Sequence, residues 1–285
     1  MDKKKQQKEY YPLVMTIGGS DSSGGAGIQA DLRTFNALGA YGCSAVSAVV
    51  SSSPLKTALQ ISIGKDLLVS QIESVMQAMP VKYVKSEMLM DAESIKALAE
   101  AAKRFRWTLI CDPMLTDWDG NSFLSDGAVE ALKEFLFPAA AWIMPNLPEA
   151  EQLIGKKIVG KSALISAAAE LNRKYKCNVV ITGGKGSGRE ALDVVCCEKE
   201  LYQMSAPRLE LDSPEVSHGI GGTFSAAFTA ALAMKLAWKD ALREAKAFVL
   251  GSLREAVELS DQVQAMYPPT EDCIDFVKIA KVLNK

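Results

Sequence analysis

The stretch SHGIGGTFSAAF, residues 217–228, holds the residues whose types and spacing best suit chemistry. Gly219, Gly221 and Gly222 precede a run of small and apolar residues, which predicts a tight backbone turn leading into a closely packed helix. The first N–H groups of a helix have no acceptor within it, and the helix dipole makes their surroundings positive. We therefore expect the three glycines to form a backbone anion hole.

Oxygen-bearing side chains follow two other apolar runs. Asp112 comes directly after residues 107–111, and Asn146 and Glu149 open a helical stretch after residues 141–144. A structural interpretation is capping, with Asn146 as N-cap and Glu149 three residues on. A functional interpretation is a site for hydrated Mg²⁺, which takes few protein ligands and binds substrate phosphates. The pattern alone leaves both interpretations open.

Three isolated residues also allow a structural and a functional interpretation. Asp31 lies in the first half of a helical stretch, where a carboxylate is favourable even without a ligand. His218 is the only histidine and precedes the glycine turn, so it is either a structural or a catalytic side chain. Lys185 stands in GGKGSG as either a solvated loop residue or a phosphate contact.

Two nucleotide-binding patterns match only in part. GAGIQA, residues 25–30, has the dinucleotide spacing, but it follows its strand too late and has no acidic residue near position 50. GGKGS, residues 183–187, lacks the first glycine of a P-loop, because Val179 stands at that position. We therefore expect neither a Rossmann dehydrogenase nor a P-loop enzyme.

The elements that must position these residues alternate along the chain. Strands are expected where apolar runs are short, and helices where apolar residues recur at helical spacing. The first helix is expected over 26–39, with Gly39 at its end. The expected strands are 12–17, 41–50, 57–63, 81–85, 107–111, 141–144 and 178–182, and the other helices 65–79, 91–105, 126–136, 161–175 and most of 219–258.

This alternation predicts an α/β fold with parallel strands covered on both faces. In such sheets the ligand lies beyond the carboxyl ends of the strands. The segment beyond Tyr267 contains Pro268 and Pro269 and is expected to dock loosely. Polar or glycine-rich clusters follow five strands directly and are expected on one rim, at 18–27, 51–53, 112–120, 145–149 and 183–188.

Composition narrows the class of protein. The chain has 285 residues, of which 48% are apolar and 23% charged, with a net charge of −2. These values are typical of a globular protein and favour neither nucleic acid nor an anionic membrane as a partner. No apolar run approaches the roughly 18 residues of a membrane span, and the charged start does not resemble a secretory signal. We expect a charged tail at 1–11 and a single domain at 12–285.

The six cysteines indicate a reducing compartment. None form a C-x-x-C pair, and Cys43, Cys111 and Cys177 lie in or beside strand-like runs, where a thiol is usually a small buried hydrophobe. We expect a cytoplasmic protein without disulfides. With one histidine and no paired cysteines, a zinc site is not expected.

Long motifs carry a resemblance to a known family. TIGGSDSSGGAGIQADLRTFNALGAYG near the start, DP at 112–113, PNLPEAEQL at 145–153, APR at 206–208 and HGIGGTFSAAFTAAL at 218–232 resemble the hydroxymethylpyrimidine/phosphomethylpyrimidine kinases of thiamine synthesis. These kinases belong to the ribokinase-like superfamily, and the related bacterial pyridoxal kinases are similar too. The resemblance runs from about Pro12 to Val257.

The resemblance implies a three-layer α/β/α sandwich with a mostly parallel sheet. It implies transfer of a phosphoryl group from ATP, with Mg²⁺, to the hydroxymethyl group of a small heteroaromatic ring, and a homodimer. The implied site comprises the anion hole of Gly219, Gly221 and Gly222, a metal group of Asp112 and Glu149, a nucleotide group of Asn146, Glu149, Thr182 and Gly184, and a substrate group of Gly19, Asp31, Ser52, Glu87 and Met88.

Five positions depart from the family pattern. Gly222 stands where the anion-hole turn usually carries a cysteine, and Glu87 replaces a glycine near the substrate. Ser52 aligns with a glutamine that contacts the pyrimidine, and Thr182 with a frequent lysine. Residues 118–120 replace a Lys-Ser/Gly-Gly run. The metal motif is thus kept while the acceptor pocket is changed.

Three functions are compatible with this pattern. The first is a kinase of the hydroxymethylpyrimidine type, slow or altered in specificity, because losing a general base typically costs about 10² to 10⁴ in rate. The second is a kinase for pyridoxal or another hydroxymethyl heterocycle. The third is a non-catalytic binding or regulatory protein on the kinase scaffold. A pairing of Glu87 with an exocyclic amine would favour the aminopyrimidine, which we state as a hypothesis.

Overall fold

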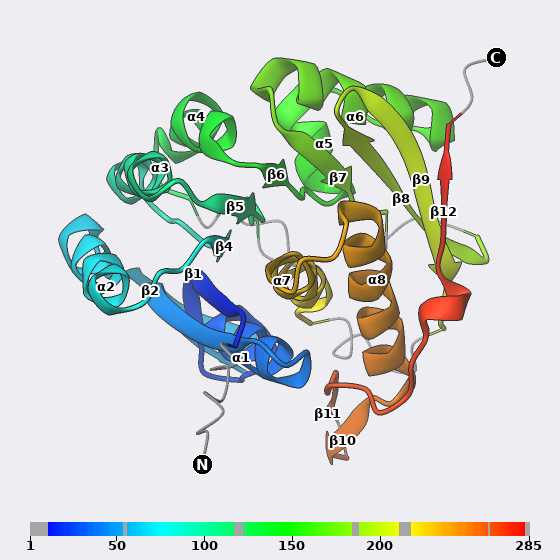
Figure 1. Ribbon diagram of the computed structural model, residues 1–285, viewed down its shortest axis with the longest axis horizontal. Coiled ribbons are helices and arrows are strands. Elements are labelled where there is room, and N and C mark those ends of the chain that lie inside the picture. The colour runs from blue at the N-terminus through cyan, green and yellow to red at the C-terminus, as the bar shows by residue number, and fades with distance from the viewer. Residues whose placement is uncertain are drawn as a thin grey trace, which may run out of the picture.

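A twisted ten-stranded sheet organises the computed structural model, which describes residues 11–53, 56–116, 122, 124–183, 188–210, 218–261 and 263–282. The strand order is β12-β9-β8-β7-β6-β5-β4-β1-β2-β3 (Figure 1). The strands are β1 (Leu13–Asp21), β2 (Tyr41–Ser53), β3 (Lys56–Ser62), β4 (Tyr83–Ser86), β5 (Thr108–Cys111), β6 (Trp142–Ile143), β7 (Asn178–Ile181), β8 (Glu190–Cys197), β9 (Glu200–Pro207) and β12 (Lys278–Lys281).

The middle of the sheet is parallel, as the alternation predicted. Strands β2, β1, β4, β5, β6 and β7 pair in parallel, and the paired residues include Thr16 with Lys85 and Ser86 with Cys111. Of these strands, β4, β5 and β7 are short and nearly fully buried, because helices cover both faces of the sheet there. The edges are antiparallel, formed by β3 on one side and by β8, β9 and β12 on the other.

Helices form a layer on each face of the sheet (Figure 1). One layer contains α1 (Gly27–Ala37), α7 (Ile220–Ala233) and α8 (Trp238–Arg254). The other contains α2 (Lys65–Ala78), α3 (Ala92–Phe105), α4 (Ala128–Ala131), α5 (Leu147–Ile154) and α6 (Gly160–Tyr175). Two apolar clusters fill the spaces between sheet and helices, one under α2, α3 and α6 and one under α7 and α8. The predicted three-layer sandwich is therefore confirmed.

The ends of several elements follow local chemistry. Helix α1 ends at Ala37, and the expected terminal glycine, Gly39, follows with a φ of +78°. Helix α3 begins at Ala92, and the side chain of its N-cap, Asp91, accepts a hydrogen bond from Ser94 N. The expected helix at 126–136 is irregular, because α4 continues as a π-helical turn (Leu132–Leu136) and a 3₁₀ turn (Phe137–Ala139).

One sequence expectation about the second half of the chain is wrong, and one hairpin there was not predicted. The segment beyond Tyr267 does not dock loosely, since Cys273 and Val277 are buried and β12 extends the sheet beside β9. The hairpin of β8 and β9 was missed because its turn, Glu198-Lys199, adopts positive φ without the usual asparagine or glycine.

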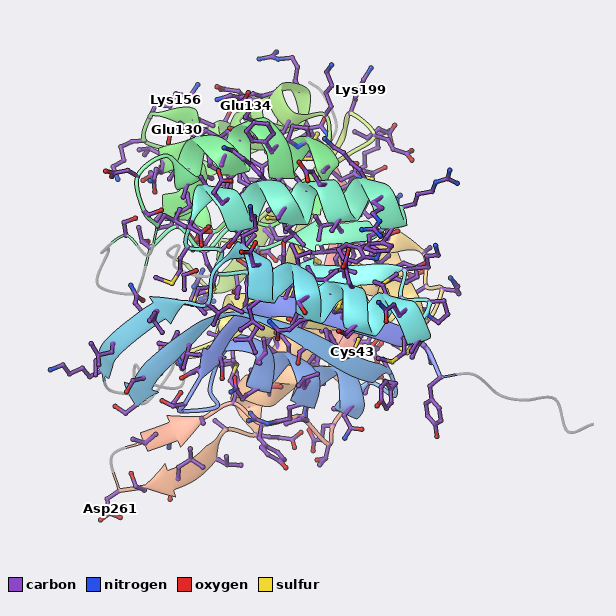
Figure 2. All side chains as sticks on the ribbon, turned by 90° about the vertical axis from the view of Figure 1, so that its left-hand side faces the viewer. Cys43, Glu130, Glu134, Lys156, Lys199 and Asp261 are labelled. Atoms are coloured by element: carbon purple, nitrogen blue, oxygen red, sulfur yellow. The ribbon has the colours of Figure 1, made fainter. Side chains whose placement is uncertain are left out.

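A small hairpin stands apart from the central sheet. Strands β10 (Val257–Ser260) and β11 (Val263–Ala265) pair only with each other, and Asp261 marks the projecting turn between them (Figure 2). All six cysteines are free thiols, and five of them are buried. Among the described residues no helix is long and apolar enough to span a membrane.

Candidate active site

One cavity of about 240 Å³ opens beyond the carboxyl ends of the parallel strands. Four of the five expected rim clusters contribute to its wall, those after β1, β2, β5 and β6, and the start of α7 closes one side. In the fifth cluster Gly184 and Lys185 lie outside the described residues, as do residues 118–120 and 1–10. The wall is formed by Gly19, Asp21, Ala26, Gly27, Val50, Ser52, Thr57, Glu87, Met88, Asp112, Met114, Thr116, Asn146, Glu149, His218 and residues 219–222.

The predicted anion hole lies at the N-terminus of α7. Gly219 is the N-cap, with a φ of +82° and no side chain that could cap the helix. Its carbonyl accepts the first helical bond, from Thr223 N, so the N–H groups of residues 220–222 have no acceptor within the helix. These N–H groups line the cavity wall and carry the positive end of the α7 dipole. The arrangement suits a phosphate oxygen.

A close backbone approach fixes the position of this helix start. A Cβ at Gly219 would lie 2.2 Å from the carbonyl oxygen of Gly25, so no side chain fits there. Likewise a Cβ at Gly27 would lie 2.4 Å from the carbonyl oxygen of Gly19. Gly219 thus lets the loop after β1 lie against the turn before α7, and Gly27 allows a close approach to β1.

Asp21 ties the same two segments together and was missed by the sequence analysis. Its carboxylate accepts hydrogen bonds from Ser23, Ala26 and the Ser52 hydroxyl, and it lies 3.0 Å from His218 Nε2. Burial alone would raise the pKa of Asp21, but these hydrogen bonds outweigh it and hold that pKa well below its usual range. His218 therefore has a structural partner. The available signal was a carboxylate directly at the end of β1.

Beneath the cavity a buried lysine joins two carboxylates. Lys85 Nζ donates to Asp31 Oδ1 at 2.5 Å and to Glu87 Oε2 at 2.8 Å, and none of the three side chains is more than 2% exposed. Asp31 Oδ2 accepts a hydrogen bond from Thr16 Oγ1 at 2.5 Å. Asp31, expected to contact the substrate, therefore lies behind the cavity wall with both oxygens engaged, and it does not line the cavity.

Glu87 forms part of the cavity wall next to Gly222. A Cβ at Gly222 would lie 3.3 Å from Glu87 Oε2 and 3.5 Å from Lys85 Nζ. The glycine therefore leaves the carboxylate room beside the anion hole. Glu87 Oε1 is buried and accepts no hydrogen bond from the described residues. Gly18 allows this placement as well, because a Cβ there would lie 2.6 Å from Glu87 Cγ.

Asp112 lies against the start of α7. Its Oδ2 accepts a hydrogen bond from Ser225 Oγ at 3.0 Å, and a Cβ at Gly221 would lie 3.9 Å from it. Burial and the charge of Glu149 raise the pKa of Asp112 to about 7. A cation would relieve this excess of negative charge, and Mg²⁺ needs only one or two carboxylates beside water and phosphate. Asp112 therefore fits the expected metal.

Asn146 and Glu149 form a full capping box at the start of α5. Asn146 Oδ1 accepts from Glu149 N, and Glu149 Oε2 accepts from Asn146 N. Glu149 Oε1 also accepts from Leu115 N, which anchors the loop after Asp112. The capping interpretation is thus confirmed, and both residues also line the cavity, so the functional interpretation stays a prediction.

Three of the remaining expected residues line the cavity, and Thr182 lies next to Asn146, which also lines it. Gly19, Ser52 and Met88 line it near the substrate side, and Met88 adopts a φ of +42°. Thr182 pairs with Asn146 as an isolated parallel bridge, and its N–H donates to the Pro145 carbonyl. The structure thus brings Gly19, Ser52, Met88, Asn146 and Thr182 to one rim, whereas Asp31 lies behind the cavity wall, and the binding roles of all of them stay predictions.

Comparison with known proteins agrees with this arrangement. A family model described as phosphomethylpyrimidine kinase matches residues 21–267. A hydroxymethylpyrimidine/phosphomethylpyrimidine kinase of Rhizobium meliloti is 35% identical over 253 residues, which cover 88% of this chain and 92% of that protein.

Two solved structures share this fold over most of the chain. A pyridoxal kinase from Staphylococcus aureus in complex with AMP-PCP superposes with a TM-score of 0.85 at 30% identity. The match covers 96% of this chain and 100% of that chain. A phosphomethylpyrimidine kinase from Clostridium difficile superposes with a TM-score of 0.73 at 31% identity, covering 84% and 97%. On the family match and on the identity to its members, the chain belongs to the phosphomethylpyrimidine kinase family.

Proposed function

We propose that this protein transfers the γ-phosphoryl group of ATP to the hydroxymethyl group of hydroxymethylpyrimidine, its monophosphate or both. One observation carries the proposal. The N–H groups at the start of α7, the Asp112 carboxylate and the wall that contains Ser52, Glu87 and Met88 all open on the same cavity. An anion site, a cation site and a partly apolar pocket are the parts that phosphoryl transfer to a small ring requires.

The chain's own groups account for positioning and charge. The N–H groups of residues 220–222 would hold the oxygens of the transferring phosphoryl, where negative charge must be stabilised. Asp112 would hold Mg²⁺ on the phosphates, and Glu149 would keep Leu115 and the loop after Asp112 in place. When bound, the metal supplies charge neutralisation at the phosphate oxygens.

The nucleotide enters on the side of β6 and β7 in this proposal. Asn146 and Thr182 lie at adjacent strand ends, and Gly183 N donates to Asp193, which is itself held by Lys246 at 2.6 Å. The use of ATP is supported by relatives that are kinases and by the solved complex with AMP-PCP. We also propose that the protein forms a homodimer and is located in the cytoplasm.

The acceptor is assigned from the relatives rather than from the fold. Kinases with the hydroxymethylpyrimidine name are 32% to 36% identical over most of the chain, with 35% for the one from Rhizobium meliloti. A pyridoxal acceptor is the second candidate, because the pyridoxal kinase of Staphylococcus aureus superposes with a TM-score of 0.85. A TM-score measures the path of the backbone and does not report on the pocket side chains, so it weighs less for acceptor choice.

The experiment is ADP release from Mg-ATP with hydroxymethylpyrimidine, its monophosphate or pyridoxal. Asp112→Asn is paired with Asp126→Asn, which changes an exposed aspartate in the same way. We expect turnover with a pyrimidine acceptor, a loss of about 10²-fold or more in Asp112→Asn, and wild-type turnover in Asp126→Asn. Faster turnover of pyridoxal would assign the second acceptor. Pyrimidine binding in calorimetry without ADP release would show a binding protein and overturn the kinase proposal.

A further inference from the structure

Glu87 carries a buried polar atom that the fold leaves without a hydrogen bond. The residue is 2% exposed and lines the cavity, and its Oε1 has no partner among the described residues. A buried carboxylate oxygen without a donor is costly, so native proteins rarely keep one unless a ligand supplies the donor. The donor for Glu87 should therefore come from a molecule bound in the cavity.

The position of Glu87 indicates which part of that molecule donates. Its Oε2 lies 3.3 Å from the place that a Cβ of Gly222 would occupy, and Gly222 carries one of the N–H groups at the start of α7. The carboxylate is therefore adjacent to the anion hole. Under the proposed function, the acceptor hydroxyl must approach the phosphoryl group at this point.

Lys85 makes a carboxylate tolerable beside a phosphate. Its ammonium bridges Glu87 Oε2 and Asp31 Oδ1, at 2.8 and 2.5 Å, and all three groups are buried. Burial alone would lower the pKa of Lys85, but Asp31 and Glu87 outweigh it and raise that pKa, so the lysine stays charged. Lys85 and Asp31 are thus positioning residues that fix the Glu87 carboxylate.

We propose that Glu87 is the catalytic base, a role that rests on the proposed kinase function. The hydroxyl oxygen of the acceptor forms a bond to the γ-phosphorus while the bond from that phosphorus to the β–γ bridging oxygen breaks. ADP leaves with the electron pair of the broken bond, and the hydroxyl proton passes to the Glu87 carboxylate. The proton returns to solvent when the product leaves. Glu87, directly after β4, thereby accepts the proton, a function that Gly222 cannot provide because it has no side chain.

The first test compares Glu87→Gln with Glu134→Gln. Glu134 lies on the outer surface of the helical layer and gives a matched change of charge (Figure 2). Removing a general base typically costs about 10² to 10⁴ in rate, so we expect kcat of Glu87→Gln to fall by that factor while KM for the acceptor changes little. Glu134→Gln should keep the wild-type kcat.

Chemical rescue separates proton acceptance from a structural role. Glu87→Gly removes the side chain and leaves its space open to a small carboxylate, so added acetate should restore part of kcat. Acetate should have no effect on wild type or on Glu134→Gln. In Gly222→Ala the new Cβ would press on Glu87 Oε2. This substitution should therefore lower kcat when it is made in the wild-type protein. It should cause no further fall in kcat when it is made in the Glu87→Gln variant.

The outcomes distinguish this proposal from the proposed function. If wild type turns over and Glu87→Gln keeps its kcat with only KM raised, Glu87 contacts the ring amine and the catalytic role is overturned. If Glu87→Gln unfolds, the rescue of Glu87→Gly and the Gly222→Ala variant decide the same question. If wild type releases no ADP with any acceptor, the kinase proposal itself fails, and the role of Glu87 fails with it.

Discussion

Two carboxylates face the same cavity in opposite hydrogen-bonding states. Asp21, at the end of β1, meets five hydrogen-bonding groups, namely Ser23 N, Ser23 Oγ, Ala26 N, Ser52 Oγ and His218 Nε2. Glu87, after β4, accepts one hydrogen bond from Lys85, and its Oε1 accepts none among the described residues. Both carboxylates are buried and are held by polar neighbours, so burial alone does not separate their roles.

The difference lies in what each carboxylate can still accept. Asp21 uses its lone pairs to hold the loop after β1 against the turn before α7, so it belongs to the architecture of the site. Glu87 keeps an oxygen that no described residue satisfies. The two carboxylates thus differ in their hydrogen-bond partners, and we propose that this difference separates a structural group from a reactive one. The following predictions test this contrast.

The largest effect should come from breaking the contact that Asp21 supports. In Gly219→Ala the methyl group meets the Gly25 carbonyl at 2.2 Å, and the residue must also keep a φ of +82°. The left-handed conformation costs about 1–2 kcal/mol for a non-glycine residue, and with the clash we expect unfolding free energy to drop by about 4 kcal/mol. Gly64→Ala, with a φ of +80° and open space around it, should lose only about 1 kcal/mol.

Chemical denaturation of both glycine variants measures the difference. Activity should disappear in Gly219→Ala and persist in Gly64→Ala, because only the first displaces the anion hole. Equal losses of stability in the two variants would show that the approach of the two loops contributes nothing beyond backbone conformation.

Isosteric amides at the two carboxylates should separate stability from turnover. Asp21→Asn leaves several donors facing an amide that cannot accept from all of them, so we expect a loss of about 2–3 kcal/mol in unfolding free energy. Glu87→Gln should lose less than about 1 kcal/mol, because its amide oxygen still accepts from Lys85, which keeps the Asp31 carboxylate. The order of the two variants should reverse for turnover, so that Glu87→Gln loses more kcat than Asp21→Asn. A Glu87→Gln variant less stable than Asp21→Asn would contradict the assigned roles.

Low pH should reduce the free energy of unfolding, because Asp21 becomes protonated and its carboxylate no longer accepts all of its hydrogen bonds. Its hydrogen bonds hold the pKa below the ordinary value of 3.8, so the unfolded state binds a proton more readily than the folded state. The stabilisation is therefore complete above that ordinary value and is lost as the pH falls through the lower pKa of the folded state. The stability gap between wild type and Asp21→Asn should narrow when denaturation is repeated below about pH 4. A constant gap would mean that Asp21 has an ordinary pKa.

The smallest effect should come from Ser52→Ala. This change removes one of the five groups around Asp21, and Ser23 N still donates to the same oxygen. We expect a loss of about 0.5–1 kcal/mol, measured as a shift in the denaturation midpoint. A loss as large as that of Asp21→Asn would mean that Ser52 alone holds the carboxylate.

Much of the fold could be predicted because it depends on short-range patterns. Apolar runs and helical spacing gave the parallel strands and most helices, and Asn146 with Glu149 gave the capping box at α5. The hairpin of β8 and β9 escaped because its turn uses Glu198 and Lys199, residue types that carry no turn signal. Strand β12 was not predicted, because this edge strand forms by pairing with the open side of β9 and its own sequence carries no strand pattern.

The sequence by itself determined the rim and the free N–H groups at the start of α7. Strand ends followed by glycine and polar clusters identify the ligand face, since the carboxyl ends of parallel strands share one edge. The glycines at 219, 221 and 222 identify free helix N–H groups, since the first turn of any helix leaves them without acceptors. Both inferences need only a few neighbouring residues and a rule of backbone geometry.

Only the tertiary structure decided which side chain does what on that rim. Asp21 and His218 meet across 197 residues, and Glu87 lies beside Gly222, which is contributed by a helix from the last quarter of the chain. The resemblance implied a substrate contact for Asp31, and the structure adds that Thr16 and Lys85 bond to its two oxygens. Such contacts depend on the order of strands and the packing of helices, and no local pattern encodes the distance between two distant side chains.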